Sequence, residues 1–545
     1  MCGIAGSINL AAKSLPDRAM LQRMADALTH RGPEDEGFLV APGVGFAQRR
    51  LSIVGLEDGQ QPIHNEDRTV AAICNGEFFE YPERRADLEA KGHVFRTHSD
   101  SEILVHLYEE YGEGLFPYLK GQFAFAIFDL ERGVVLLGRD RVGICPLFWT
   151  RQGDTVYFAS EIKALIASGA LRPEADPRGL DHLFTFFALS SRRTAFKGVQ
   201  ALEPGHYLRI ELPRGRGAAN PVERKYWDFD FPDWGQELDG DAGQLTESFE
   251  AVFERAVDVR LRADVPVVGY LSGGVDSAFV MATAARVAGR PLPSFTLRIP
   301  KDNLDEVDEA MEAAEAIGAH PTVVEAGSDL IMGSYEALTR AAESPVLDTS
   351  CAALLALSRE VRSQGYKVVL TGEGADEGFA GYVWFKMREI ARALDIGDSF
   401  STTKFLSRAV RRIGARQSIE RLKEIDALIG GPHAQSVMYS LVSTSRDRYY
   451  SAGFKEELGG HLAYEDLDLD LDRMARWHPL NRSLYLGYKV HLAGLLLSQK
   501  GDRIAMANSV ETRYPFLDED VIAFVSQLSP RWKLRRPTRD KYLLR

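Results

Sequence analysis

The strongest constraint on the fold is the alternation of short apolar runs with helix-patterned segments after residue 241. Helical spacing of apolar residues predicts helices over 245–261, 305–317 and 351–363. The apolar runs between them are "VPVVGYLSGG", "LPSFTLRI", "PTVVEA" and "YKVVLTGEG". This succession indicates an α/β domain around a parallel sheet. Residues 385–545 show an almost wholly helical pattern, so the domain is expected to end in a helical part.

Residues 1–210 indicate a different, mainly β fold. Helices are expected only at 17–30 and 100–111. Glycine and aspartate turns divide the rest into strands within 43–55, 69–79, 121–140 and 154–162. An antiparallel two-sheet layer with packed helices fits this pattern. The segment 211–240 is first Pro/Gly-rich and then acidic and aromatic, so we place the connection to a second domain, 241–545, there.

Charge and cysteine usage exclude several classes of protein. The net charge of −13 argues against nonspecific nucleic-acid binding, which needs a basic surface. The four cysteines are far apart and form no CxxC pair, which argues against a zinc site or a disulfide framework and favours a reducing cytoplasm. The N-terminus lacks a signal-peptide pattern, and no apolar run approaches the ~18 residues that a membrane span needs. We therefore expect a cytoplasmic protein with no membrane or nucleic-acid partner.

The first residues, "MCGIAGSINL", have two interpretations. Cys2 is small and apolar enough to begin a buried edge strand. Alternatively, loss of Met1 would place a thiol nucleophile and a free α-amine, which could act as its base, on one residue. These residues alone leave both interpretations open.

The segment "LSGGVDSA" (271–278) lies where a predicted strand meets a predicted helix. Its glycines allow backbone N–H groups to surround an anion at a helix N-terminus. The segment is not a Walker A loop, because no Gly-Lys-Ser/Thr follows. Asp276 would repel phosphate unless a cation intervened, so the loop predicts a Mg²⁺-bridged pyrophosphate.

A second loop, "LTGEGADEGFAGY" (370–382), also follows an apolar strand. It places Glu373, Asp376 and Glu377 at the carboxyl edge of a parallel sheet, where ligands bind. The plain alternative is a solvated turn with acidic N-cap residues. Two such loops on neighbouring β/α units favour the ligand site.

A third group lies in the first domain: "HRGPEDEG", "RRLSIV", "CNGEFF" and "HSDSE". An Asn-Gly pair can supply an oxyanion hole, Glu77 and Asp100 can hold an ammonium group, and Arg50 a carboxylate. Each of these residues alone is more often structural. Together they fit an amino-acid-sized ligand beside a nucleophile.

These motifs, with "GQFAFAIFD", "GRDRVGICPLF" and "DRIAMANSVETRYPFLD", resemble the glutamine-hydrolysing asparagine synthetase family (class B) over nearly the whole chain. The resemblance implies an N-terminal-nucleophile (αββα) glutaminase domain followed by an α/β ATP-pyrophosphatase-type synthetase domain. Of the two interpretations of Cys2, the resemblance implies the second, in which Cys2 is the nucleophile.

The resemblance implies a role for each matching residue. Catalytic roles fall to Cys2, to Asn75 and Gly76 as oxyanion hole, and to Glu373 at the adenylate step. Glutamine would be held by Arg50, Leu51, Ser52, Ile53, Val54, Asn75, Gly76, Glu77 and Asp100. ATP would contact Leu271, Ser272, Gly273, Gly274, Val275, Asp276, Ser277, Leu297, Thr371 and Gly372. Mg²⁺ would bind Asp276 and Asp376. Ammonia would pass to the second site through an internal tunnel, and the family is compatible with a homodimer.

The sequence departs from the family in four places. Glu80 stands where the family usually has Asn, and Ala278 stands where the family frequently has Ser. The segment 344–353, where the acceptor should bind, is not Thr-rich and contains no Arg. The family also continues past the position of Arg545 to a lysine that contacts the adenylate, so we expect the C-terminal end of the second domain to be lacking. Lys541 is predicted to begin an amphipathic helix capped by Thr538.

Three functions follow from these observations. The leading one is ATP- and glutamine-dependent amidation of aspartate, with Asp348 or Glu343 facing the ammonium group and Arg340 or Arg359 as the nearest arginines for the α-carboxylate. The second is the same chemistry on another carboxylate, such as a natural-product or cell-surface intermediate. The third is a regulatory or scaffold protein that has lost synthesis, against which the intact site residues argue.

Overall fold

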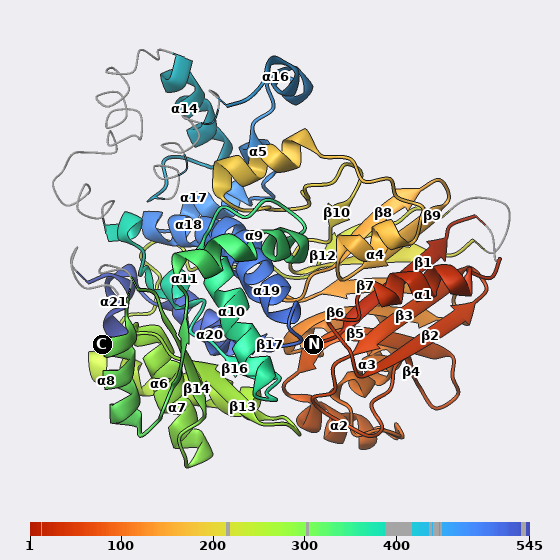
Figure 1. Ribbon diagram of the computed structural model, residues 1–545, viewed down its shortest axis with the longest axis horizontal. Helices are drawn as coiled ribbons and strands as arrows, with labels where there is room; N and C mark the ends of the chain where they lie inside the picture. The colour runs from red at the N-terminus through yellow and green to blue at the C-terminus, as the bar shows by residue number, and fades with distance from the viewer. Residues whose placement is uncertain are drawn as a thin grey trace.

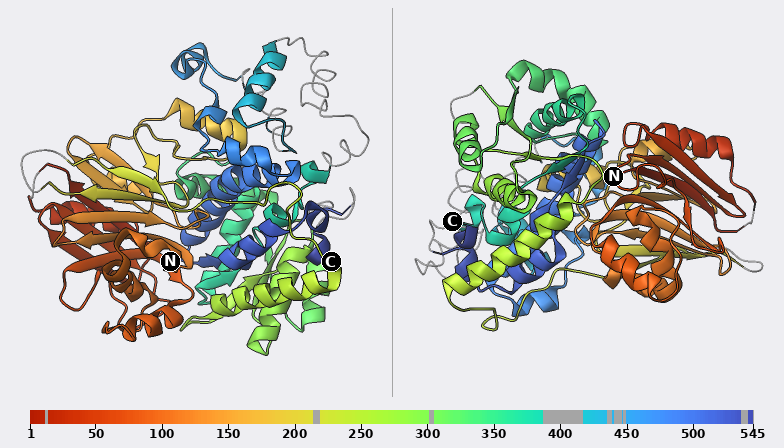
Figure 2. Two further views of the ribbon diagram at one scale, coloured as in Figure 1. Left: turned by 180° about the vertical axis from the view of Figure 1, so that it is seen from behind. Right: turned by 90° about the horizontal axis from the view of Figure 1, so that it is seen from below.

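The chain folds into two domains that lie side by side, with the N-terminal half coloured red to yellow and the C-terminal half green to blue (Figures 1 and 2). The computed structural model describes residues 1–11, 14–213, 219–300, 305–386, 417–434, 439, 446, 449–535 and 541–544.

The N-terminal domain contains two six-stranded antiparallel sheets. The first has the order β10-β8-β9-β1-β3-β2 and the second β12-β11-β7-β6-β5-β4. Their strands are β1 (Gly3–Asn9), β2 (Asp35–Ala41), β3 (Val44–Arg50), β4 (Ile63–His64), β5 (Val70–Phe78), β6 (Gly121–Asp129), β7 (Val134–Arg139), β8 (Phe148–Gln152), β9 (Thr155–Ala159), β10 (Gln200–Ala201), β11 (His206–Glu211) and β12 (Val222–Lys225). The helical elements are α1 (Arg18–Asp26), α2 (Tyr81–Glu89), η1 (Asp100–Glu102), α3 (Ile103–Tyr111), η2 (Gly112–Tyr118), α4 (Ile162–Ala167) and α5 (Pro177–Phe186).

Alternation along the strands explains how these layers stack. On β1, Ile4 and Ile8 join the core that lies between the two sheets, where Ile73 of β5 is also buried. Ala5, on the opposite face of β1, packs instead with Leu21 of α1. Helix α3 covers the outer face of the second sheet. The resulting helix–sheet–sheet–helix order confirms the predicted αββα layer.

The C-terminal domain is built on a parallel five-stranded sheet of order β15-β14-β13-β16-β17. Its strands are β13 (Val267–Tyr270), β14 (Ser294–Arg298), β15 (Thr322–Glu325), β16 (Val368–Leu370) and β17 (Glu511–Arg513). The first helices are α6 (Ala242–Leu261), α7 (Val275–Ala288), α8 (Val307–Ile317), α9 (Ser328–Ala342), α10 (Ser350–Ser363) and α11 (Ala375–Phe379). This part confirms the predicted α/β succession, and α9 is an addition that the sequence pattern did not indicate.

The rest of the C-terminal domain is largely helical, as expected. It contains α14 (Gln417–Leu428), α16 (Ala452–Leu458), η3 (Ala463–Asp466), α17 (Leu471–Arg476), α18 (Pro479–Leu486), the π-helical η4 (Gly487–Asp502), α19 (Arg503–Met506), η5 (Pro515–Leu517), α20 (Glu519–Gln527), α21 (Pro530–Lys533) and η6 (Tyr542–Leu544). The sequence pattern, which was almost wholly helical here, did not indicate strand β17, which pairs in parallel with β16. Three residues are too few to show a strand period, so only pairing reveals this strand.

The predicted connection 211–240 is partly a strand of the first domain. Within it, β12 pairs antiparallel with β11. The later part runs along the second domain, where the Trp234 N–H donates to the Arg476 carbonyl and the Leu238 N–H to the Gln527 carbonyl. The described connection is therefore anchored to both domains and is not a free linker.

One buried arginine joins the two domains. Arg31 follows α1, has no solvent exposure, and forms a bidentate ion pair with Asp502 of η4 at 2.8 Å for both bonds. Its other bonds reach Glu161 and the Cys2 carbonyl, both at 2.9 Å. All the hydrogen bonds of the Arg31 guanidinium are therefore made to buried groups at the interface between the domains.

We expect the substitution Arg31→Leu to destabilise the protein by about 3–5 kcal/mol, because it leaves the buried carboxylate of Asp502 without its cation. The measurement is the midpoint of thermal unfolding. Arg178→Leu, at an exposed helical position of α5, is the matched control and should leave the midpoint nearly unchanged. Equal midpoints for the two variants would contradict this role of Arg31.

Among the described residues, no helix is both long and apolar enough to cross a membrane.

Candidate active site

Cys2 lies at the start of β1, and the pairing of β1 with β3 fixes its position. Its backbone N–H donates to Asn75 Oδ1 at 2.8 Å, and its Sγ lies 3.9 Å from the Leu51 carbonyl oxygen. The residue is 6% exposed, and burial raises the pKa of its thiol. The amine of Met1 pairs with Glu511 of β17. Burial would lower the pKa of that amine, but Glu511 outweighs it and raises the pKa to about 10.

Asn75 and Gly76 are neighbours on β5 beside Cys2. Asn75 Nδ2 is buried and has no hydrogen-bond acceptor among the described residues, so it can donate to an oxyanion. Gly76 has a φ of 154°, and a Cβ there would overlap the Gln122 carbonyl oxygen. The strand can therefore pass this point only with glycine.

Two buried carboxylates, those of Glu77 and Asp100, lie next to this site. Asp100 Oδ2 accepts the Phe78 N–H at 2.8 Å, and Glu77 Oε1 lies 3.7 Å from Arg513 Nη2 of β17. Burial raises the pKa of both carboxyl groups, and their nearby negative charges raise it further. Such a pair suits a ligand ammonium group, which would relieve that repulsion.

Arg50 braces the turn that follows β3. Its guanidinium donates to the carbonyls of Val54 at 3.2 Å and Leu56 at 3.3 Å, and also to that of Gly55. The predicted glutamine-binding backbone, Leu51 to Val54, is thereby held in place, and the Ser52 N–H donates to Glu34 at 2.8 Å. In this structure the Arg50 guanidinium therefore binds the backbone of the turn, whereas the sequence pattern predicted that it binds a ligand carboxylate.

The second site is a cavity of about 730 Å³ at the carboxyl ends of β13, β14 and β16. Most of the residues predicted for ATP, metal and adenylate line it: Leu271, Ser272, Gly274, Asp276, Ser277, Leu297, Thr371, Gly372, Glu373 and Asp376. Gly273 and Val275 are not among its lining residues. Gly273 instead packs against Glu306 and Glu309 at the start of α8.

Hydrogen bonds hold the loop before α7 in a tight turn. Ser277 Oγ accepts the Ser272 N–H at 3.0 Å, and Ser272 Oγ accepts the Gly274 N–H at 3.2 Å. The loop after β16 contacts this turn, because a Cβ on Gly372 would lie 2.9 Å from the Ser277 backbone nitrogen. The two glycine loops therefore form one surface, as their positions at parallel strand ends indicated.

Two lysines, neither predicted, neutralise the carboxylates of this cavity. Lys541 Nζ pairs with Asp276 and, at 2.6 Å, with Asp376 Oδ1. Lys500 Nζ lies 3.6 Å from Glu373 Oε1. Burial raises the pKa of Asp276 to about 6 against the opposing effect of Lys541. Burial favours neutral lysine, but the facing carboxylates outweigh it and raise the pKa of Lys541.

Lys541 does not begin an α-helix within the described residues, contrary to the sequence-based expectation. It has a φ of 50° and precedes the single 3₁₀ turn η6. The expected cap, Thr538, lies outside the described residues. The position of Lys541 depends on contacts with distant loops, which a local pattern does not contain. Lys500 could have been suspected from its place just before the "DRIAMANSVETRYPFLD" motif.

The carboxylates also fit Mg²⁺, which prefers hard oxygen ligands. Asp276 Oδ1 is buried and has no hydrogen-bond partner in the described part of the chain. By contrast, Glu377 is not a lining residue of the cavity. It accepts a hydrogen bond from Tyr382 at 2.7 Å, and burial raises its pKa to about 8.

Of the residues considered for an amino-acid acceptor, only Asp348 lines the cavity. The suggestion of Glu343 was wrong, because it pairs with Arg503 and Lys163 at the domain interface. Arg340 is 79% exposed and pairs with Glu336, and Arg359 is exposed on α10. No arginine lines the described part of the cavity; its basic lining residues are Lys500, Lys541 and His491.

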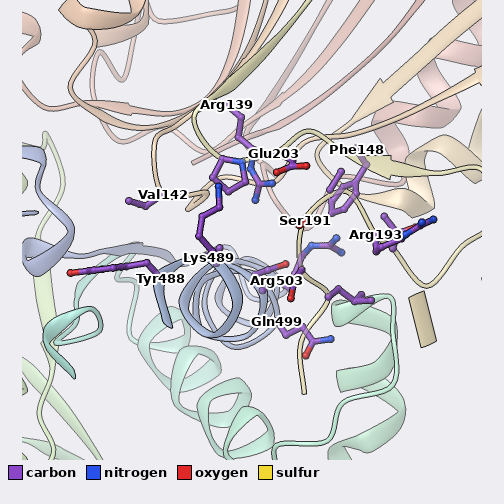
Figure 3. A pocket seen from close by; sticks show the side chains of 18 of the residues that line it. Arg139, Val142, Phe148, Ser191, Arg193, Glu203, Tyr488, Lys489, Gln499 and Arg503 are labelled. Atoms are coloured by element: carbon purple, nitrogen blue, oxygen red, sulfur yellow. The ribbon is translucent and has the colours of Figure 1, made fainter. Parts of the chain in front are cut away.

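A smaller cavity, of about 50 Å³, lies between the domains (Figure 3). Arg139, Phe148 and Glu203 reach it from the first domain, and Lys489 and Arg503 from the second. It shares no lining residue with the larger cavity, and of the residues predicted for a site only Glu343 lines it. It is therefore part of the interface between the domains.

Comparison with known proteins agrees with the division of the chain into two domains. Residues 1–227 match the family model of a glutamine amidotransferase domain, and residues 248–545 match that of asparagine synthase.

Among curated proteins, the chain is 33% identical to "Amidase chyE" of Penicillium rubens, over 96% of this chain and 81% of that one. It is 31% identical to "Amidase chry2" of Gibberella zeae, over 99% and 84%. It is also 31% identical to asparagine synthetase [glutamine-hydrolyzing] 1 of Bacillus subtilis, over 100% and 84%.

The cysteine beside the Asn75-Gly76 pair, the glycine loops of the larger cavity and these full-length matches agree with one another. The chain belongs to the glutamine-hydrolysing asparagine synthetase family.

Proposed function

We propose that this protein hydrolyses glutamine at Cys2 and uses the ammonia to amidate a carboxylate that ATP has activated as an acyl-adenylate. The observation that carries the proposal is the short connection between the two sites. The Cys2 carbonyl accepts Arg31 Nε at 2.9 Å, and Arg31 binds Asp502. Gly501 and Lys500, next to Asp502, line the larger cavity beside Glu373.

In the first domain, the Cys2 sulfur would attack the side-chain amide carbon of glutamine. Asn75 Nδ2 and the Gly76 N–H would stabilise the oxyanion. Collapse of this intermediate releases ammonia and leaves a thioester on Cys2, which water then hydrolyses to glutamate. With Met1 removed, the Cys2 α-amine would act as base. Glu77 and Asp100 would hold the ammonium group of glutamine.

In the second domain, the acceptor carboxylate would attack the α-phosphorus of ATP, and pyrophosphate would leave. The loop from Ser272 to Ser277 would hold the pyrophosphate. Mg²⁺, held by Asp276 and Asp376, would neutralise its charge. Lys541 would lie against the phosphates, and Glu373 with Lys500 would face the adenylate, which ammonia attacks to give the amide and AMP.

Ammonia needs an enclosed path between the two centres, because in water it becomes protonated and loses its nucleophilic lone pair. We propose that the path passes Arg31 and β17. Gln122 Nε2 donates to the Thr512 carbonyl at 3.0 Å at this boundary, and Thr512 lines the larger cavity.

Aspartate is the proposed acceptor, with Asp348 facing its ammonium group. A second candidate is a different carboxylate, and two observations favour it. No arginine lines the described part of the cavity to pair with an α-carboxylate. In addition, two relatives of similar identity are named amidases.

The test is pyrophosphate and AMP release by the full chain with glutamine and Mg-ATP, across a panel of carboxylic acids that begins with aspartate. Asparagine formation would establish the aspartate assignment. Stimulation by another acid but not by aspartate would establish the second candidate. Release that no acid stimulates, together with intact glutaminase activity, would contradict amide synthesis.

We further propose a cytoplasmic location, because the four cysteines are free and buried. The functional boundaries are proposed to be 1–210 for the glutaminase domain and 241–545 for the synthetase domain.

A further inference from the structure

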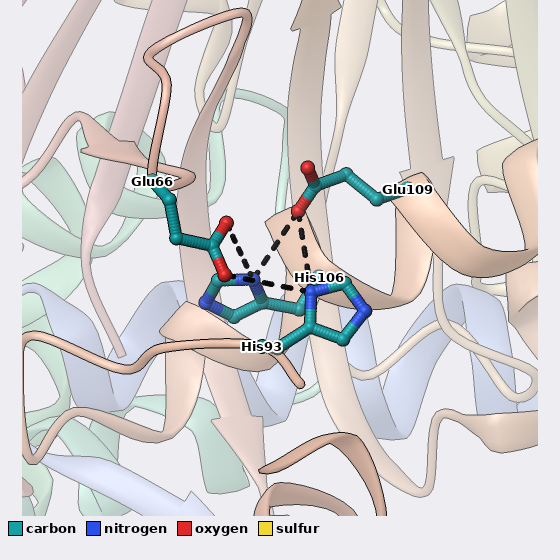
Figure 4. Close-up of side chains that lie close together, drawn as sticks. All are labelled: Glu66, His93, His106 and Glu109. Atoms are coloured by element: carbon teal, nitrogen blue, oxygen red, sulfur yellow. Dashed lines mark hydrogen bonds and ion pairs between the residues drawn. The ribbon is translucent and has the colours of Figure 1, made fainter. Parts of the chain in front are cut away.

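Four side chains of the first domain converge at a place that the glutaminase chemistry does not use (Figure 4). Glu66 follows β4, His93 lies in the loop after α2, and His106 and Glu109 lie one turn apart on α3. One ligand atom from each of the four lies within 4.8 Å of all the others. Three separate chain segments therefore present two imidazoles and two carboxylates to one point.

The distances within this cluster fit a shared ion better than direct pairing. His93 Nδ1 lies 3.6 Å from both Glu66 Oε1 and Glu109 Oε2. His106 Nδ1 lies 3.6 Å from Glu66 Oε2 and 3.2 Å from Glu109 Oε2. Ligand atoms about 2.0–2.1 Å from a tetrahedral zinc ion are about 3.3–3.4 Å apart. Hydrogen bonds between imidazole and carboxylate measure about 2.7–3.2 Å. Only His106 Nδ1 and Glu109 Oε2 are that close, whereas the other three pairs are 3.6 Å apart.

The second nitrogen of each histidine also faces a carboxylate. His93 Nε2 lies 3.2 Å from Glu110 Oε1. His106 Nε2 lies 3.7 Å from Glu102 Oε1, which is too long for a hydrogen bond, and it has no hydrogen-bond partner among the described residues. A carboxylate behind a histidine is the usual means of orienting a metal-binding imidazole and raising its basicity. Both histidines are thus turned so that Nδ1 points into the cluster.

The two carboxylates of the cluster are themselves held in place. Glu66 Oε1 accepts the Val94 N–H at 2.7 Å, and Glu109 Oε1 accepts a bond from Asn65 Nδ2 at 2.8 Å. Each glutamate can therefore point an oxygen at the ion without reorganising its loop.

We propose that Glu66, His93, His106 and Glu109 form a zinc site. Two neutral imidazoles and two carboxylates suit Zn²⁺ in type and number, and their charge of −2 balances that of the ion.

The site joins the segments that support the glutamine pocket. His93 and His106 flank η1, which carries Asp100, and Asp100 accepts the Phe78 N–H beside Gly76. Glu102 ties back to the same loop through the N–H groups of Arg96 and Thr97, both at 2.7 Å. The zinc ion would fix this loop against α3, and its role is structural.

The test is zinc binding by the full-length protein, stripped with EDTA, dialysed and titrated with ZnCl₂, with bound metal measured by mass spectrometry. One tight equivalent per chain is expected. The variants His93→Gln and His106→Gln should each weaken binding at least about tenfold. His320→Gln, at an exposed position outside the cluster, should bind as the wild type does.

Cobalt replaces zinc as a probe of geometry. The intense visible absorption of tetrahedral Co²⁺ is expected with the wild type and absent with His106→Gln. A wild-type chain that binds no zinc tightly would overturn the proposal, whatever the variants do. The proposal would also be overturned if the variant His461→Gln lost the bound zinc ion while His93→Gln kept it. His461 belongs to a separate cluster with His182 and Asp466, so this result would place the zinc there.

Discussion

Replacement of Cys2 by alanine is expected to lower glutamine hydrolysis by at least about 10³-fold, since a chain without its nucleophile retains only binding and oxyanion stabilisation. Synthesis driven by added ammonia should persist, because the larger cavity lies in the other domain. Glutamate release and ammonia-dependent AMP release, measured on one preparation, report the two activities.

Cys351→Ala is the matched control for this experiment. It makes the same change at a buried thiol of α10 in the synthetase domain, so glutaminase activity should be unchanged. Intact-mass measurement should also show that the active wild type lacks Met1, because an acylated nitrogen at Cys2 cannot serve as base. Retained hydrolysis in Cys2→Ala would remove Cys2 as the nucleophile.

The substitution Asp276→Asn is expected to lower pyrophosphate release by about 10²-fold or more, a loss typical of removing one preorganised charge from a site. The neutral amide would take away one carboxylate of the Lys541 pair and the oxygen available to Mg²⁺. Glutaminase activity should remain near wild type. Mg-ATP-dependent pyrophosphate release, with Mg²⁺ varied, measures the effect.

Asp329→Asn is the control, because Asp329 is an exposed carboxylate in the first turn of α9. The variant Lys541→Met tests the same ion pairs from the side of the lysine. It should weaken pyrophosphate release as well, since it leaves Asp276 and Asp376 to repel each other and the phosphates. Unchanged release in both Asp276→Asn and Lys541→Met would mean that pyrophosphate binds elsewhere.

Local patterns in the sequence determined the αββα and α/β folds of the two domains. They also determined the positions of the two glycine loops, 271–278 and 370–382. The alternation of Ile4 and Ile8 with Ala5 specifies the two faces of β1, and helical spacing specifies α6, α8 and α10. These features depend on residues close together in the chain, so the sequence contains them directly.

Tertiary structure decided which side chains complete each site. Lys541 lies 265 positions from the Asp276 that it pairs with, and Arg31 lies 471 positions from Asp502. The same holds for β17, for the correction of Glu343 to an interface residue, and for the His93–His106 cluster. An ion pair between distant residues leaves no period in either segment. Its geometry is set only when both domains have packed and the low-dielectric interface makes an unpaired charge costly.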